Sequence, residues 1–411
     1  MSGAGMTGTV WIINQYASTP DTGMGGRHFY MARELARRGF RVYLISAGFH
    51  HLLRKPARFD GRFQQDVVDG VNLVRVRVPR YSGAHSRQRV ANWFLFSWRI
   101  RRLAGVLPAP DAILASSPSP IVFWGARVLA SKLNARLVSE VRDIWPLTLM
   151  LLGGKKASHP LIRLMQRLED STYRESWRVV SNLENAVEHM VGRGMPVDKF
   201  RWVPNGLSLD EVNTCARLEP DIEARLPKNS FIVGYTGTLG LANAMDHLLE
   251  AAALLRDYPD IAFVLVGEGD GKAALQQLAR DRGLDNVHFI GRIPKIQIQP
   301  MLRHFDICYI GWLKEELYQY GIGANKIPEY MYSGKPVIHA YSGACDPIER
   351  FGAGVRVEAE NPQKLAEAIL QLYNTPVAQR EAMGRRGHEA SLSHYEYGIL
   401  AGRLQSVLFD S

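Results

Sequence analysis

The chain contains little cysteine and no long hydrophobic run. Its three cysteines, Cys215, Cys308 and Cys345, are scattered and form no Cys-x-x-Cys pattern. This argues against a disulfide framework or a zinc site and fits a reducing compartment. No uninterrupted apolar run reaches the roughly 18 residues that a transmembrane helix needs. The first ten residues also lack the apolar core of a signal peptide, so we expect a cytoplasmic protein.

Several motifs of metal and phosphate chemistry are missing as well. The sequence has no D-x-D pair to hold a metal ion and no Walker A pattern to bind a triphosphate. The segment HEASLSH, residues 388–394, lacks the His-Glu-x-x-His spacing of zinc hydrolases. We therefore expect neither a metal nor a cofactor.

Positive charge is concentrated in the first half of the chain. Residues 1–200 carry 29 Lys and Arg against 14 Asp and Glu, whereas the remaining residues are mildly acidic and the whole chain has a net charge of +10. A basic half suggests contact with nucleic acid, an anionic membrane surface or a phosphorylated substrate. An ordinary solvated surface is the alternative.

Apolar strand patterns alternate with helical segments, and this alternation occurs twice. The first series begins with TVWIINQY and the second with FIVGYTG. Alternating strands and helices predict parallel sheets covered on both faces, hence an α/β fold. We predict one Rossmann-like domain at residues 1–205, completed by a returning C-terminal helix at about 390–411, and another at residues 206–389. They are expected to face each other across a cleft.

The segment YGIGANKIPEYMYSGKPVIHA, residues 320–340, combines features that suit a nucleotide bound to a sugar. Asn325 can cap a short helix, and the cation of Lys326 lies beside two glycines that let a phosphate approach. The carboxylate of Glu329 could accept two hydrogen bonds from a ribose diol. The alternative is a plain capped helix whose Glu329 points to water.

Two other loops follow predicted strands. In GMGG, residues 23–26, Gly25 and Gly26 would let backbone N–H groups approach a phosphate, although a flexible loop is the alternative. SEVRDIWPLTL places Arg142 and Asp143 at the end of a strand, where ligands bind in such folds. Asp143 could accept a proton from a hydroxyl group. Alternatively, Arg142 and Asp143 form an ion pair that fixes the loop.

Aromatic and basic residues are interleaved in residues 80–103. Trp93, Phe94 and Trp98 lie between arginines, a composition that suits the interface of an anionic membrane. A helix that faces the core is the alternative.

The chain resembles a known enzyme family over nearly its whole length. The segments that carry the resemblance are GMGGRHFYMARELARRGFRV, EVRDIWP, VPNGLSLD, GYTGTLG, VLVGEGD, HFIGRIP and NKIPEYMYSGKPVI. In this order they resemble the retaining nucleotide-sugar glycosyltransferases of family 4, which have the two-domain GT-B fold. The subgroup that builds bacterial surface polysaccharides is the most similar.

The resemblance implies roles for individual residues and also shows departures. Glu329 matches the second glutamate of the family's E-x7-E motif, which binds ribose, but the first glutamate is replaced by Gly321. Thr238 stands where relatives use a cation on the diphosphate, so we expect Lys326 to provide that charge. The segment GRIP matches the family's segment whose backbone reads the base, which implies that Arg292 and Ile293 lie beside it.

The sequence and the resemblance together predict a retaining glycosyltransferase. It would move a sugar from a nucleoside diphosphate, with uridine favoured over guanosine, to a lipid-linked acceptor sugar during surface-polysaccharide synthesis. We expect donor binding in the second domain, acceptor binding in the first, and a peripheral location on the inner face of the membrane, with no nucleic-acid partner. A nucleotide-sugar 2-epimerase of similar build, or a basic nucleic-acid-binding protein, are the alternatives.

Overall fold

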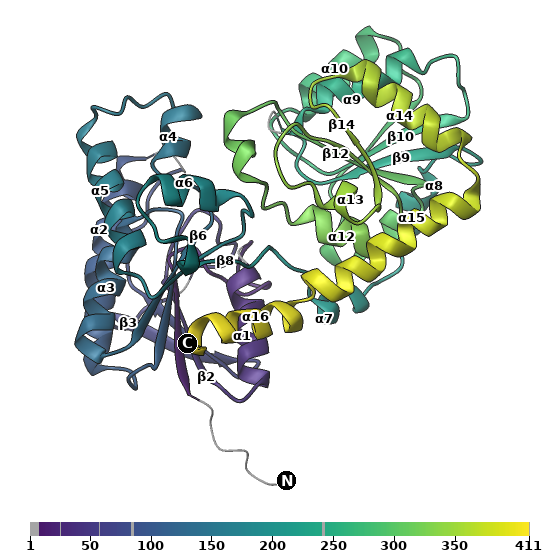
Figure 1. Ribbon diagram of the computed structural model, residues 1–411. Coiled ribbons are helices and arrows are strands. Elements are labelled where there is room, and N and C mark those ends of the chain that lie inside the picture. The colour runs from purple at the N-terminus through teal and green to yellow at the C-terminus, as the bar shows by residue number, and fades with distance from the viewer. Residues whose placement is uncertain (1–7, 25, 57, 84–85, 241–242, 411) are drawn as a thin grey trace, which may run out of the picture. The chain divides into compact units, whose positions relative to one another are not determined.

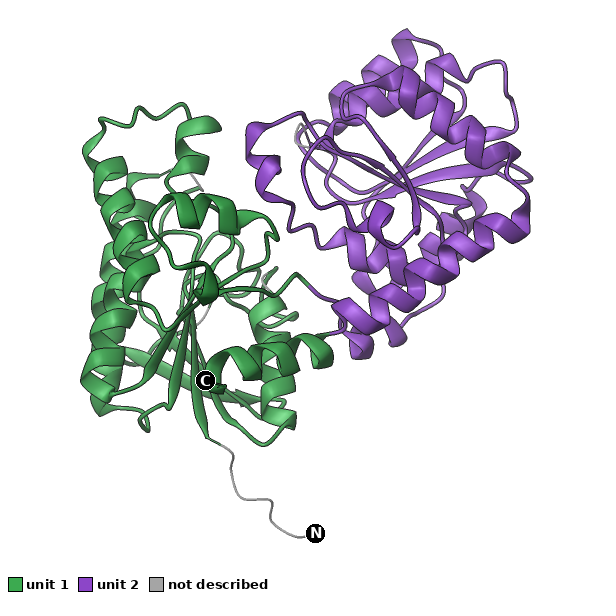
Figure 2. Ribbon diagram, in the orientation of Figure 1, with its two compact units in different colours: residues 1–205, 397–411 green, residues 206–396 purple. Residues whose placement is uncertain are grey.

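The protein divides into two compact units (Figure 2). A computed structural model describes residues 8–410 except 25, 57, 84–85 and 241–242. The first unit consists of residues 1–205 and 397–411, and the second of residues 206–396. Residues 390–396, which the sequence assigned to the first domain, lie in the second unit. Ala390 and Tyr395 are buried in its core, and the Ser391 hydroxyl donates to the Pro328 carbonyl at 3.0 Å.

The first unit contains one eight-stranded sheet, in the order β3-β4-β2-β1-β5-β6-β7-β8. Only β3 runs antiparallel to its neighbour, β4. The strands are β1 (Thr9–Asn14), β2 (Arg41–Ala47), β3 (Phe63–Val68), β4 (Val71–Val76), β5 (Ala112–Ser116), β6 (Arg136–Val141), β7 (Arg178–Ser181) and β8 (Phe200–Trp202).

Helices cover both faces of this sheet (Figure 1). The α-helices are α1 (Gly26–Arg37), α2 (Arg87–Ile100), α3 (Ile121–Leu133), α4 (Leu147–Leu151), α5 (Pro160–Glu175), α6 (Ala186–Gly192) and the returning α16 (Tyr397–Phe409). The 3-10 helices are η1 (Arg101–Gly105) and η2 (Val197–Lys199).

Alternation along the strands decides which helices cover which face. Val10 and Ile12 of β1 pack in one core with α1 and α16, where the Tyr30 and Tyr397 ring centroids are 5.0 Å apart. The intervening residues of a strand point to the opposite face. Because α16 follows residues of the second unit in sequence, its burial here ties the end of the chain to the first unit.

The second unit contains a six-stranded parallel sheet in the order β11-β10-β9-β12-β13-β14. This is the order of a doubly wound dinucleotide-binding fold. The strands are β9 (Phe231–Thr236), β10 (Ile261–Val266), β11 (Val287–Ile290), β12 (Ile307–Gly311), β13 (Val337–Ala340) and β14 (Gly354–Val357).

The helices of the second unit separate by face in the same way. Phe231 and Val233 of β9 pack with α9 and α14, whereas Ile232 faces the opposite core with α12. The α-helices are α7 (Leu209–Asn213), α8 (Pro220–Ala224), α9 (Met245–Leu254), α10 (Lys272–Asp281), α11 (Ile298–Arg303), α12 (Lys326–Tyr332), α13 (Pro347–Arg350), α14 (Pro362–Asn374) and α15 (Val377–Ala390). Shorter turns are the 3-10 helices η4 (Lys295–Gln297) and η5 (Glu316–Tyr320) and the π-helical η6 (Ser391–Tyr395).

The prediction of two parallel α/β domains is confirmed, with one addition. The edge strand β3 was not expected, and Asp69 and Gly70, both at positive φ, form the tight turn that joins it to β4. The cleft between the domains stays a prediction. Among the residues described, no helix is both long and apolar enough to cross a membrane.

Candidate functional site

Each sheet has a switch point, where neighbouring strands lead to helices on opposite faces. It lies between β1 and β5 in the first unit and between β9 and β12 in the second. Ligands of doubly wound sheets bind outside the carboxyl ends of the strands at this point. Both units place polar side chains there, and the two sets differ in how their charges are compensated.

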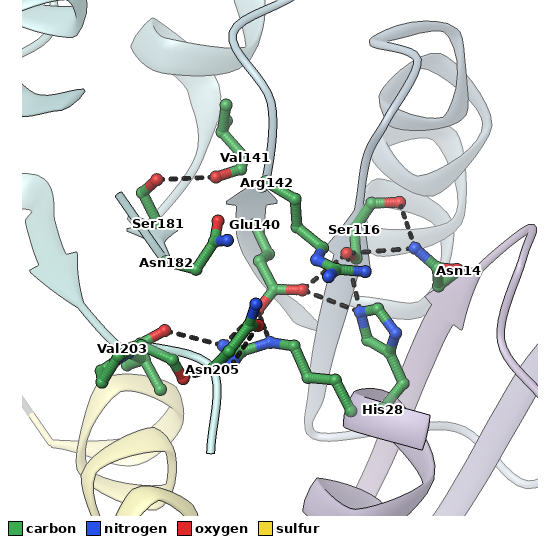
Figure 3. Close-up of polar contacts among 12 residues, drawn as sticks. Asn14, His28, Ser116, Glu140, Val141, Arg142, Ser181, Asn182, Val203 and Asn205 are labelled. Atoms are coloured by element: carbon green, nitrogen blue, oxygen red, sulfur yellow. Dashed lines mark hydrogen bonds and ion pairs between the residues drawn. The ribbon is translucent and has the colours of Figure 1, made fainter. Parts of the chain in front are cut away.

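In the first unit, a buried carboxylate lies at the carboxyl end of β6 (Figure 3). Glu140 Oε1 accepts hydrogen bonds from Arg27 Nε at 3.1 Å and from an Arg27 terminal nitrogen at 2.8 Å. Burial alone would raise the pKa of Glu140, but Arg27 and the hydrogen bond from His28 outweigh it and hold the pKa well below its usual range. Glu140 is therefore ionised, and Arg27 compensates its charge.

His28 and Ser116 bind the other oxygen of the same carboxylate. The Ser116 hydroxyl donates to Glu140 Oε2 at 2.6 Å, and His28 Nε2 lies 2.8 Å from the same oxygen. Burial lowers the pKa of His28, so the ring is neutral and its Nε2–H donates to the carboxylate. Asn14 at the end of β1 completes the cluster through a 3.2 Å contact with the Ser116 hydroxyl.

Arg27 also fixes the last residues of the first unit. Its guanidinium donates to the carbonyl of Val203 at 2.8 Å, to the carbonyl of Pro204 and to the side-chain oxygen of Asn205 at 3.3 Å. With the two bonds to Glu140, all five N–H groups of the guanidinium have an acceptor. Arg27 has no donor left for a ligand, so its role is to hold the chain in place.

Arg142 and Asp143 follow directly after β6. The backbone N–H of Arg142 donates to the Ser117 hydroxyl at 2.9 Å, and its buried Nε has no hydrogen-bond partner among the described residues. Figure 3 shows its guanidinium on the side of Ser116 and Glu140. Within the part of the chain that is described, no ion pair joins Arg142 to Asp143, so the alternative of a loop-fixing pair receives no support.

Asp143 is exposed to solvent and lies beside a small cavity. Desolvation by the surrounding protein raises the pKa of its carboxyl, with an opposing effect from Arg142. The rings of Phe123, Trp145 and Tyr173 contribute to the cavity wall. The predicted proton acceptor therefore stands free next to aromatic rings, an arrangement suited to a sugar.

Of the two glycines of GMGG that were predicted to approach a phosphate, the structure describes Gly26 only. Gly25 lies outside the described residues, so its predicted contact with a phosphate has no structural account. Gly26 is the first residue of α1, and a Cβ there would lie 2.6 Å from the Tyr30 ring. Packing against Tyr30 is thus enough to require glycine at position 26, and its binding role stays a prediction.

In the second unit, Lys326 begins α12 and reaches back to β9. Its ammonium donates to the Tyr235 hydroxyl at 2.6 Å and to Asn243 Oδ1 at 3.2 Å, and it lies 4.2 Å from the centroid of the Tyr235 ring. Burial lowers the pKa of Lys326 to about 8, with a smaller opposing effect from Glu329. Unlike Arg27, Lys326 has neutral hydrogen-bond partners.

The loop after β9 is shaped around this lysine. Gly237 has φ +149°, and a Cβ on it would lie 2.6 Å from Lys326 Nζ. The Thr238 carbonyl accepts from the Tyr235 hydroxyl at 2.7 Å and from the Asn243 amide at 3.0 Å, while the Thr238 residue itself is exposed. Thr238 and Asn243 therefore belong to the network around Lys326, a cation distant in sequence.

Glu329 has a partner that the sequence did not indicate. It forms an ion pair with Lys295, and the two line a small cavity together with Glu211, Cys215 and Gln299. Because a carboxylate can accept about four hydrogen bonds, the pair with Lys295 leaves capacity for a ribose diol. The carboxylate does not simply point to water, and the role of Glu329 toward ribose stays a prediction.

Of three other positions around the donor site, one departs from its expectation. Asn325 occupies the position before α12, but its side chain makes no capping hydrogen bond, because the residue already has helical dihedral angles. Ile293 is buried in the core and Arg292 is exposed. The expected contact with the base is made by the backbone of this segment, so it stays a prediction. Gly321 has φ +94°, which disfavours a glutamate at this position.

The aromatic segment is corrected in part. Trp93 is 4% exposed, donates to the Tyr16 hydroxyl at 2.7 Å and packs edge-on against Trp145. Phe94 is partly buried against the same cluster. Trp93 is therefore a core residue, because the inner face of α2 packs against α3 and Trp93 joins a cluster with Ile121 and Met165, and it cannot insert into a membrane. Trp98 is 39% exposed, so the prediction that it contacts a membrane still stands.

The pairing of Arg27 with Glu140 was missed, and so were the places of Tyr235 and Lys295 in these clusters. Arg27 follows the glycines of GMGG directly, but its partners Glu140 and Val203 are far away in sequence. Tyr235 reads as an ordinary buried strand residue. Among the described residues, no group of three or more His, Cys, Asp or Glu side chains is placed to hold a metal ion.

Two family descriptions match the chain, one for each unit. Residues 22–206 match a "glycosyl transferase 4-like domain" and residues 230–375 match "glycosyl transferases group 1". Over 275 residues the chain is 26% identical to WcaI of Escherichia coli, named as a colanic acid biosynthesis glycosyl transferase; the match covers 65% of this chain and 67% of WcaI.

A second relative matches over a shorter part. The chain is 29% identical over 186 residues to a GDP-mannose-dependent monoacylated phosphatidylinositol monomannoside mannosyltransferase of Corynebacterium glutamicum. This match covers 44% of the chain and 45% of the relative, so the chain spans less than half of that protein.

Solved structures share the fold at low sequence identity. Sucrose-phosphate synthase of Thermosynechococcus elongatus superposes with a TM-score of 0.73 at 16% identity, covering 97% of this chain and 98% of that one. HepE of Anabaena, solved with UDP-glucose, superposes with a TM-score of 0.66 at 15% identity, covering 98% and 99%. Each unit thus matches a glycosyltransferase domain description, and the chain as a whole shares the GT-B fold of these structures.

Proposed function

We propose that the protein is a retaining glycosyltransferase that moves a sugar from UDP to a lipid-linked acceptor sugar in surface-polysaccharide synthesis. The observation that carries the proposal is the ammonium of Lys326 at the switch point of the second unit. Its hydrogen-bond partners, Tyr235 and Asn243, are neutral, so its charge is not compensated by a bonded carboxylate.

A diphosphate supplies the missing charge. Burial disfavours the ammonium form of Lys326, and a bound anion reverses that effect because opposite charges attract strongly in a partly desolvated site. Gly237 leaves the space above the lysine free of a side chain. When the bond between the sugar and the diphosphate breaks, the leaving group gains negative charge, and Lys326 stabilises it in the transition state.

Similar proteins support the choice of donor. HepE was solved with UDP-glucose, which favours uridine, whereas the mannosyltransferase of Corynebacterium is named for GDP-mannose. We propose UDP as the nucleotide, with GDP as the competing outcome of the test. The relatives reported above are named transferases, so a 2-epimerase is not favoured.

The acceptor is proposed to bind in the first unit. A hydroxyl of the acceptor sugar would donate to Asp143, beside the rings of Phe123 and Trp145. In the retaining reaction, the bond between the sugar carbon and the diphosphate breaks, and the new bond forms on the same face. The acceptor proton passes to the leaving diphosphate, while Asp143 orients the hydroxyl. The lipid-linked acceptor is favoured by the phosphatidylinositol-linked substrate in the name of one relative.

Thermal unfolding in the presence of UDP, GDP and UMP tests the donor site. A ligand that binds only the folded state raises Tm, and we expect UDP to give the largest increase. Lys326→Met should abolish most of this increase. Lys314→Met, which removes a lysine paired with Glu358 on the surface of the same unit, is the matched control and should leave it unchanged. No increase with any nucleoside diphosphate would overturn the proposal.

Asp143→Asn tests the acceptor side separately. The variant should lower turnover while the rise of Tm with UDP stays intact, because the substitution leaves the donor site untouched. Normal turnover in this variant would remove Asp143 from the mechanism without affecting the donor assignment.

A further inference from the structure

The surface formed by α2, η1, α3 and the adjoining ends of β3 and β4 carries a cluster that the proposed donor and acceptor sites do not use. It consists of two tryptophans and five arginines, here called the arginine–tryptophan patch: Arg62, Arg77, Trp98, Arg99, Arg101, Arg102 and Trp124. Residues 71–110 of the sequence contain eight arginines and no acidic residue. The patch therefore lies on the most basic part of the chain.

Stacked side chains make the patch continuous. The Arg102 guanidinium lies 4.2 Å from the centroid of the Trp98 ring, and Arg101 lies 4.6 Å from that of Trp124 and 6.0 Å from that of Trp98. The Arg99 guanidinium donates to the carbonyl of Arg77. These contacts hold the cations on one surface rather than leaving them spread in solvent.

The positive charges of the patch are not compensated within the protein. Across the described residues, none of the five arginines forms an ion pair with a carboxylate, whereas Arg127 and Arg193 of the same unit pair with Glu175 and Asp170. The pKa of Arg99 is lowered, first by burial and then by Arg102, Arg77 and Arg62. Like charges held together without counter-charges favour an anionic partner.

We propose that the arginine–tryptophan patch docks the protein on the surface of an anionic lipid bilayer. Arginines at the headgroup level bind lipid phosphates, and tryptophan is favoured at the membrane interface. The patch adds apolar surface: Trp98 is 39% exposed and the neighbouring Val106 47% exposed. The inference rests on the proposed function for its purpose, since a lipid-linked acceptor requires the enzyme to work at a membrane.

The stacking favours a membrane over a nucleic acid. Single-stranded nucleic acids bind by stacking bases on free aromatic faces. Here Arg102 covers a face of Trp98 and Arg101 covers a face of Trp124. The remaining exposed groups are the arginines, the uncovered part of Trp98 and the side chain of Val106, which fit headgroups and the upper acyl chains.

Vesicle co-sedimentation tests the patch. We expect the full chain to bind phosphatidylcholine vesicles that contain phosphatidylglycerol, to bind pure phosphatidylcholine weakly, and to be released by salt. Arg101→Gln with Arg102→Gln should weaken binding about fivefold for each arginine removed, as each basic residue near such a surface contributes about that factor. Trp98→Ser should weaken it further.

A second tryptophan of the same unit provides the matched control. Trp177 is 37% exposed and lies between Arg136 and Arg178, at 5.1 and 4.9 Å. Trp177→Ser with Arg178→Gln removes the same kinds of groups from another surface and should leave vesicle binding unchanged. All variants should keep the Tm of the wild type to within a few degrees, since the altered side chains are partly exposed.

The outcomes separate this inference from the proposed function. Three results would contradict docking on an anionic bilayer. They are equal binding to neutral and anionic vesicles, an equal loss of binding in the Trp177 control, and tighter binding to a single-stranded oligonucleotide than to anionic vesicles. Vesicle binding without any rise of Tm by nucleoside diphosphates would leave the patch standing and overturn the donor site. A rise of Tm with nucleoside diphosphates but no vesicle binding would support the donor site and contradict the role of the patch.

Discussion

Arg27 in the first unit and Lys326 in the second are both cations near the switch point of a parallel sheet, yet their surroundings are opposite. Arg27 is fully buried, and all five of its N–H groups meet acceptors, two of the bonds going to the carboxylate of Glu140. Lys326 is only partly buried, and its hydrogen-bond partners are the neutral Tyr235 and Asn243. The charge is compensated in one case and left uncompensated in the other.

This difference separates a residue that stabilises the fold from one that is ready for a ligand. A compensated buried ion pair cannot gain from an added anion, because its charges and hydrogen bonds are already used. A desolvated ammonium without a hydrogen-bonded counter-charge lowers the stability of the free protein and strengthens the binding of an anion. Substitutions at the two positions should therefore affect different measurements.

The largest expected effect is on stability. Glu140→Gln leaves Arg27 buried beside a neutral amide, so the free energy of unfolding should fall by about 3–5 kcal/mol. Glu175→Gln breaks the exposed pair with Arg127 and should cost no more than about 1 kcal/mol. Urea unfolding of both variants measures the difference. Equal losses would show that the buried pair has no special role.

Acid should weaken the same cluster. Glu140 has a lowered pKa, because Arg27 and His28 outweigh its burial, and burial lowers the pKa of His28 from 6.5. Both shifts mean that the unfolded chain binds more protons than the folded one, so stability is full at neutral pH and is lost as the pH falls. For His28 the loss begins near pH 6.5, and for Glu140 below about 4.5. In Glu140→Gln, the part of this loss below pH 4.5 should be much smaller.

The second largest effect is on turnover. Lys326→Ala should lower turnover about 10²-fold or more, the scale for a lost contact to a developing anion. Its effect on UMP binding should be smaller, because UMP lacks the outer phosphate. Thr238→Ala serves as the control, since Thr238 enters the network through its backbone carbonyl. A near-normal rate for Lys326→Ala would place the charge elsewhere, with Arg142 as the next candidate.

A smaller effect is expected at Glu329. If its carboxylate binds the ribose diol, Glu329→Ala should weaken UDP binding by about 1.5–3 kcal/mol in calorimetry. Lys295→Met removes the partner but keeps the carboxylate, and should cost clearly less. Equal losses in the two variants would mean that the ion pair shapes the cavity and that Glu329 does not touch the nucleotide.

The architecture could be predicted from the sequence because its signals are local. Strand patterns such as TVWIINQY and FIVGYTG appear as β1 and β9, and the division of the chain falls at residues 205 and 206. The edge strand β3 escaped notice because FQQDVV is half polar, as expected for a strand with one face in water. Residues 390–396 were misplaced because their packing against α12 is a tertiary contact.

The partners within the candidate site could not be predicted in the same way. Asp143, Lys326 and Glu329 stand out by their places next to strands and glycines. Their contacts do not, because Tyr235 comes from a strand about ninety residues before Lys326. Trp93 and Trp98 differ by five positions on α2, and only the packed structure shows that Trp93 faces the core and Trp98 the solvent. Periodicity alone cannot decide between faces when both carry aromatic residues.

The smallest predicted effect is a pH dependence of donor binding, and it gives the sharpest test of the comparison. The pKa of Lys326 is lowered to about 8, so in the free protein the ammonium loses its proton as the pH rises through this value. A diphosphate binds the charged form, so the affinity for UDP should be constant below pH 8 and fall above it, by no more than about tenfold per pH unit. Lys326→Arg keeps its charge throughout this range, so its affinity for UDP should stay flat, even if the longer side chain weakens binding overall. UMP should show a weaker dependence on pH in the wild type.

Calorimetry of UDP with both proteins between pH 7 and about 9.5 measures this dependence. A parallel fall of affinity in the two proteins would show that another group titrates. The cation of the second unit would then be no more exposed to a ligand than Arg27, and the contrast between the two units would disappear.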